Sequence, residues 1–130
     1  MPDRDRHTDP AQAGPARPGA FARLRELAPE VVEAYEALAR AANAAGPLDP
    51  VAVALTRLAL SVGQRSWRGV HVHTRKALEA GATPEAVRQV AVLAVPTVGL
   101  HASLDALRWI DEIVAERQGD SSVVRGSTCG

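Results

Sequence analysis

Two segments of the chain, residues 51–62 and 87–95, are apolar on nearly every side of the helix that each would form. A helix of that kind has to be covered on most of its surface. A chain of 130 residues is expected to build a single small domain, and such a domain has little protein with which to cover these helices. We therefore predict an oligomer, in which the segment at 51–62 lies against another subunit.

The rest of the chain is divided into helical segments by prolines at helix starts and glycines just after helix ends. No segment alternates apolar and polar residues with period two, and no hairpin signal is present, so the predicted fold class is all-α, with about five to six helices. The predicted helices cover residues 21–27, 29–44, 51–62, 66–80, 83–95 and 101–117.

The two ends of the chain differ in composition from its middle. Residues 1–19 hold four prolines and few large apolar side chains, and residues 118–130 are rich in glycine and serine. Neither end can bury enough apolar surface to offset the entropy of ordering it. We predict a disordered tail at each end and a helical domain at residues 20–117.

Charge and cysteine content exclude several classes of protein. Fifteen basic residues balance fifteen acidic ones, which gives no electrostatic reason to expect nucleic acid or an anionic membrane as a partner. No apolar run approaches the length of a membrane span, and no secretory signal is visible. The single cysteine, Cys129, excludes a disulfide framework, so a cytoplasmic location is predicted.

Two sequence blocks carry a resemblance to a known family. Residues 71–94 read HVHTRKALEAGATPEAVRQVAVLA, and residues 99–107 read GLHASLDAL. They resemble the core of the carboxymuconolactone decarboxylase and alkyl hydroperoxidase D-like superfamily, in which a histidine is followed by a short helix, an AGAT-like turn and a further helix. The likeness extends over about residues 50–112. It implies the alkyl hydroperoxidase D-like helical bundle, assembled as a homotrimer or a hexamer.

The peroxidase branch of that superfamily carries the motif CxxCxxxH, with a glutamate upstream. If the motif's histidine is His73, then Ser66 and Gly69 stand at the two cysteine positions and Ala54 stands at the glutamate position. The peroxidase reaction needs one thiolate to attack the O–O bond and a second thiol to resolve the sulfenic acid. Thiol peroxidase activity is therefore not expected.

The decarboxylase branch works without cysteines and retains the histidine. This resemblance implies a cofactor-free lyase acting on a small carboxylated or lactone-like compound, with His73 as general acid/base. His101 stands where the family usually has proline, and it is either a second catalytic acid/base or an exposed histidine at a helix start. The alternative for the whole chain is a non-catalytic helical oligomer that has lost the thiol chemistry.

Four further residues are candidates for substrate binding. Arg57 interrupts an apolar helix, so it is expected to bind a substrate carboxylate, to pair with an acid such as Asp105, or to form an ion pair with another subunit. Ser66 could donate a hydrogen bond, and Trp67 could form the wall of an apolar pocket. His71 lies about 200° round the helix from His73, so it is either a packing residue or part of the site. No metal ligand set and no organic cofactor are predicted.

Overall fold

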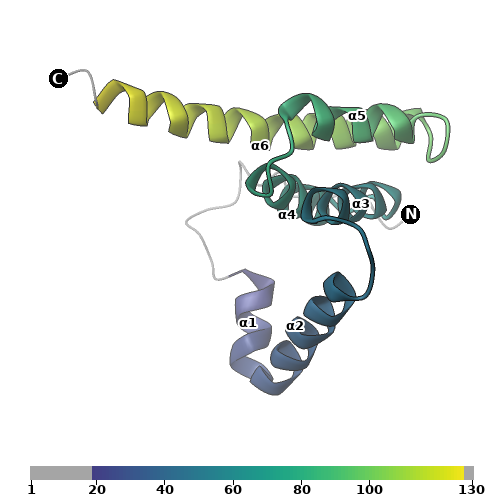
Figure 1. The fold of residues 1–130 in the computed structure, drawn as a ribbon, viewed down its shortest axis with the longest axis vertical. Helices are drawn as coiled ribbons and strands as arrows, with labels where there is room; N and C mark the ends of the chain where they lie inside the picture. Colours follow the sequence, from purple (N-terminus) through teal and green to yellow (C-terminus); the bar gives the residue numbers. More distant parts are fainter. Residues whose placement is uncertain (1–18, 128–130) are drawn as a thin grey trace, which may run out of the picture. The chain divides into compact units, whose positions relative to one another are not determined.

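A computed structural model describes residues 19–127 of the chain, and the side chains of residues 19–119. This part of the chain is helical and contains no strand, which confirms the predicted all-α class. The chain divides into two compact units, Met1–Gly46 and Pro47–Gly130. The helices shown in Figure 1 are α1 (Ala20–Leu27), α2 (Pro29–Ala44), α3 (Pro50–Gly63), α4 (Trp67–Glu79), α5 (Pro84–Ala94) and α6 (Leu100–Ser127).

Five helices begin and end within one or two residues of the predicted boundaries. Prolines open α2, α3 and α5, where the missing N–H costs no intrahelical hydrogen bond. The predicted last helix ended at Arg117, whereas α6 continues to Ser127 and so runs into residues assigned to a C-terminal tail. No proline follows Arg117, and a single glycine such as Gly119 only lowers helix stability. The predicted N-terminal tail up to residue 18, and Cys129, lie outside the described residues.

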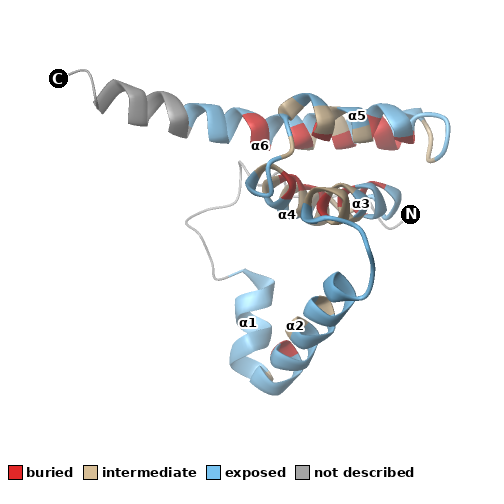
Figure 2. Cartoon of the chain, viewed as in Figure 1, coloured by how far each residue is buried: buried red, intermediate tan, exposed pale blue. Residues whose placement is uncertain are grey.

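The first unit consists, in its described part, of α1 and α2 joined by Ala28. The rings of Phe21 and Tyr35 meet edge to face with their centroids 6.1 Å apart, and Arg25 pairs with Glu36 at 2.8 Å. Val32 is the one buried residue among the described residues of this unit (Figure 2). Its remaining large apolar side chains are exposed, so this helical pair has very little core of its own.

The second unit has a core built where α3, α4, α5 and α6 face one another. Helix α3 packs on α4 and α5, and α6 packs on the same two helices. Small residues at the contacts let the helix axes approach closely. The buried core residues are Ala54, Leu58, Val62, Val70, Ala77, Val87, Ala91, Ala94, Ala106, Ile110 and Val114.

Among the described residues, helix α3 is covered by its neighbours except along one exposed stripe. Ala54, Leu58 and Val62 are buried, whereas Leu60 is 63% exposed. This exposed apolar surface is what the predicted contact with a second subunit requires. That contact stays a prediction. None of the helices in the described part of the chain is sufficiently long and apolar to cross a membrane.

Candidate functional site

The connection between α3 and α4 fixes how these two helices meet. The amide of Ser66 donates to the carbonyl oxygen of Ser61 at 3.1 Å, and the amide of Arg65 donates to that of Val62 at 3.0 Å. Arg65 has a φ of 55°, so this is a Schellman turn with arginine in the left-handed position that usually holds glycine. Ser66 then caps α4 by accepting the Gly69 amide at 3.0 Å. The chain reverses within three residues, and α3 and α4 run antiparallel.

The closest approach between α3 and α4 is at Ser61 and Gly69. A Cβ atom on Gly69 would lie 2.7 Å from Ser61 Oγ and 3.0 Å from Ser61 Cβ, closer than such atoms come in proteins. Gly69 is therefore needed for this packing. Arg57 lies one turn before Ser61 on α3, and His73 lies one turn after Gly69 on α4. In an antiparallel pair these two positions face each other. The seam between the two helices thus places Arg57 opposite His73.

The environment of His73 favours the neutral imidazole. Burial lowers its pKa below the ordinary value of 6.5, and the positive charges of Lys76 and Arg57 lower the pKa further. The side chain is partly buried, and its Nδ1 atom is buried without a hydrogen-bond partner among the described residues. A neutral imidazole at physiological pH can accept a proton, and its protonated form beside two cations is a stronger acid than an ordinary imidazolium.

Arg57 and Lys76 complete this cluster. Arg57 is partly buried, and within the described residues neither cation forms an ion pair with a carboxylate. The suggested partner Asp105 lies near Arg108, at 3.8 Å, and no ion pair between Asp105 and Arg57 is present among the described residues. Two cations without acidic partners beside a neutral imidazole form a site suited to an anion.

His71 and Trp67 lie on another side of α4. His71 Nε2 is 2.8 Å from Glu112 Oε2 on α6, and its ring meets the Trp67 ring edge to face at 5.5 Å. The Arg68 guanidinium lies 5.4 Å from the centre of the Trp67 ring. Of these contacts, the one between His71 and Glu112 joins α4 to α6. His71 and Trp67 therefore have a packing role in the fold. Their suggested part in substrate binding stays a prediction.

His101 is exposed in the first turn of α6. No contact of this histidine with His73 or Arg57 is present in the described part of the chain. The three residues suggested as a convergent site therefore divide into a pair, Arg57 and His73, and a separate histidine. A catalytic role for His101 stays a prediction without a contact to support it.

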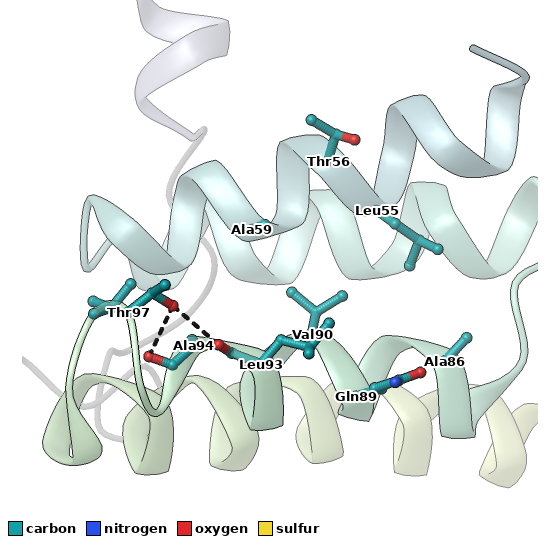
Figure 3. Close-up of a pocket in the computed structure, with 10 residues that line it drawn as sticks. Leu55, Thr56, Ala59, Ala86, Gln89, Val90, Leu93, Ala94 and Thr97 are labelled. Carbon is teal, nitrogen blue, oxygen red and sulfur yellow. Dashed lines mark hydrogen bonds between the residues drawn. The ribbon is translucent and has the colours of Figure 1, made fainter.

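A groove with a volume of about 400 Å³ lies between α3 and α5 and includes the loop after α5 (Figure 3). None of the residues suggested for the site lines it. Thr97 contributes a hydroxyl, but that hydroxyl donates to the Leu93 carbonyl oxygen at 3.0 Å. The groove is therefore mainly apolar. Its lining is Leu55, Thr56, Ala59, Ala86, Gln89, Val90, Leu93, Ala94, Thr97 and Val98.

Sequence reasoning missed two members of the seam, Ser61 and Lys76, and valued Gly69 only as a position that lacks a thiol. Lys76 could have been found, because it follows His73 by three residues on a helix. Ser61 could not, because its position opposite Gly69 depends on the turn at Arg65. Within the described residues, no group of three or more His, Cys, Asp or Glu side chains is arranged to hold a metal ion.

The model of the carboxymuconolactone decarboxylase family matches residues 29–112, from the start of α2 into α6. The chain belongs to this family. No curated protein and no solved structure matches it. This carboxymuconolactone decarboxylase family member has no cysteine within the matched residues, so the matched region contains no thiol pair.

Proposed function

We propose that this carboxymuconolactone decarboxylase family member is a cofactor-free lyase that acts on a small carboxylated or lactone-like anion, with His73 as general acid/base. The observation that carries the proposal is the unpaired cluster at the α3–α4 seam. A partly buried imidazole with a lowered pKa lies near two cations that have no acidic partner among the described residues. A structural ion pair would contain a carboxylate, and this cluster contains none.

Each member of the cluster has a chemical task in this proposal. Arg57 holds a carboxylate of the substrate, because a guanidinium binds carboxylates with two parallel hydrogen bonds. When the C–C bond to a carboxylate breaks, carbon dioxide leaves and the electron pair moves through the ring into the lactone carbonyl. The developing negative charge is stabilised by the nearby cations. His73 takes up one proton from solvent in each turnover, and its imidazolium then delivers that proton to carbon, a transfer that the lowered pKa makes more favourable.

The test is turnover of a panel of carboxylated muconolactones by wild type and His73→Gln. We expect the substitution to lower kcat/KM by about 100-fold or more, as is usual for loss of an acid/base group. Arg108→Gln, at an exposed residue outside the cluster, is the control and is expected to retain most of the activity. Equal turnover by wild type and His73→Gln would remove His73 from the mechanism.

A second proposal, self-association as a homotrimer or a hexamer, has its own support. The second unit exposes large aliphatic side chains, and the groove between α3 and α5 adds further apolar surface. This assembly does not depend on catalysis, so it is equally expected of a non-catalytic oligomer. Sizing chromatography with light scattering tests it, and a 13.7 kDa monomer at micromolar concentration would contradict it. The exposed side chains include Leu48, Leu60, Val72, Val92, Leu93, Val95, Leu100 and Leu104.

A further inference from the structure

Helices α5 and α6 together carry an exposed apolar surface. Arg88 on α5 pairs with Asp111 on α6 at 2.8 Å, so these two residues mark one side of the packed helix pair. Large aliphatic side chains continue this side of each helix toward the connecting loop, at intervals of whole turns from Arg88 and from Asp111. Each of them is between 41% and 60% exposed. These residues, which we call the α5–α6 face, are Val92, Val95, Leu100 and Leu104.

The groove between α3 and α5 lies on the opposite side of α5. Val90 of α5 borders this groove together with Leu55 of α3 (Figure 3). Leu93 also lines the groove and is 62% exposed. Arg88, on the side of the α5–α6 face, precedes Val90 by two residues and so lies about 200° round the helix from it. One copy therefore cannot bring its own face and its own groove into contact.

Both surfaces are electrostatically neutral. Every residue that lines the groove is uncharged, and the hydroxyls of Thr56 and Thr97 already donate to backbone carbonyl oxygens one turn earlier. Gln89, the remaining polar residue of the lining, is exposed. The α5–α6 face is aliphatic, and the charge of Arg88 beside it is balanced by Asp111. A partner for either surface therefore needs an uncharged apolar surface of its own, and each copy of this chain supplies two.

Contact between the two unlike surfaces covers more apolar area than contact between like ones. If the groove of one copy met the groove of another, the α5–α6 face of both copies would stay exposed, and the converse holds for a contact between two faces. When the face of one copy fills the groove of the next, every copy of a closed ring buries both surfaces. Removal of apolar area from water is the main favourable contribution to association, so the head-to-tail arrangement is favoured.

We propose that the α5–α6 face of one copy docks in the groove between α3 and α5 of the next copy, which builds a head-to-tail ring of identical subunits. The inference rests on the proposed self-association and names the two surfaces through which it occurs. Helix α5 contributes to both surfaces and therefore takes part in both contacts of each copy. The groove lining includes neither His73 nor Arg57, so assembly does not depend on the acid/base mechanism.

The experiment places one carboxylate in each surface of the full chain. Val92→Asp disables the α5–α6 face and leaves the groove intact, whereas Ala59→Asp disables the groove and leaves the face intact. Each variant alone is expected to self-associate on the order of 100-fold more weakly than wild type, because docking would bury an unpaired charge. Val72→Asp, at an exposed valine of α4 outside both surfaces, is the matched control and is expected to assemble as wild type does. Light scattering measures assembly, and circular dichroism checks that each variant is folded.

Mixing the two disabled variants decides whether unlike surfaces meet. The intact face of Ala59→Asp fits the intact groove of Val92→Asp, so an equal mixture is expected to form a heterodimer at a concentration at which each variant alone is monomeric. The heterodimer cannot grow further, because its two remaining surfaces are the disabled ones. Native mass spectrometry identifies it by a mass equal to the sum of the two different variants.

The inference and the proposed self-association fail differently. If wild type assembles but the mixture of folded variants stays monomeric, the head-to-tail contact is wrong and self-association stands. The same conclusion follows if Val92→Asp or Ala59→Asp assembles as wild type does, because the surface that carries the substitution is then not part of the contact. A monomeric wild type would contradict self-association itself, and the inference with it.

Discussion

Replacing Gly69 by alanine tests the α3–α4 contact directly. An alanine Cβ at this position would lie 2.7 Å from Ser61 Oγ and 3.0 Å from Ser61 Cβ. The hydroxyl can rotate away, but the Cβ of Ser61 is fixed to α3, so the two helices have to separate by a few tenths of an ångström. Overpacking of this kind costs about 1–3 kcal/mol. Glycine-to-alanine replacement in a compatible helix gains about 0.4–1 kcal/mol, because it restricts the unfolded chain.

Gly63, the last residue of α3, provides the matched control. A Cβ at Gly63 meets no atom within 4 Å, so Gly63→Ala receives the entropic gain without the contact. The difference in free energy of unfolding between the two variants should therefore equal the contact cost, about 1–3 kcal/mol, with Gly69→Ala the less stable. Urea denaturation followed by circular dichroism measures both values, provided that the m-values agree. Equal stability of the two variants would refute the register assigned to α3 and α4.

Three further predictions concern stability. Arg65→Gly should raise the free energy of unfolding by about 0.5–1 kcal/mol in urea, because the left-handed conformation strains arginine and not glycine, and an unchanged or lower value contradicts the turn geometry. Thr74→Val should be neutral or stabilising, because the buried Thr74 hydroxyl has no partner among the described residues, whereas Val70→Thr at the fully buried Val70 should cost about 1–3 kcal/mol. Because the folded state lowers the pKa of His73, the unfolded chain binds this proton first as pH falls below 6.5, and wild type loses stability there. In thermal unfolding between about pH 7.5 and pH 5, His73→Gln should therefore lose less stability than wild type. If the stability of the two proteins falls in parallel with pH, the prediction is wrong.

The helices were predictable because local signals mark both ends of most of them. Pro29 begins α2 and Gly81, with a φ of 108°, follows α4, as expected for a proline in the first turn and a glycine in the left-handed position. The end of α6 was predicted too early. Gly119 was read as the end of the helix, but a single glycine lowers helix stability without ending the helix. Composition describes what a segment prefers alone, and it does not determine where a helix ends.

The site was predictable only in part. His73 and Arg57 were identified as chemically unusual residues, one by family resemblance and the other by its place in an apolar segment. Their position opposite each other depends on the register between α3 and α4, which the left-handed Arg65 sets. No pattern in the sequence assigns that conformation to an arginine. The same missing register concealed Ser61, whose close approach to Gly69 depends on how α3 and α4 pack.

The tight reversal between α3 and α4 also has a consequence for the order of folding. Only Gln64, Arg65 and Ser66 separate the two helices, so the contacts across the seam join residues that are close in sequence. Closing such a short loop costs little chain entropy, and contacts of this kind form early. The α3–α4 hairpin should thus be in place when the chain crosses its folding barrier, ahead of α6. Changes in the seam are then expected to slow folding, whereas changes on the buried side of α6 mainly accelerate unfolding.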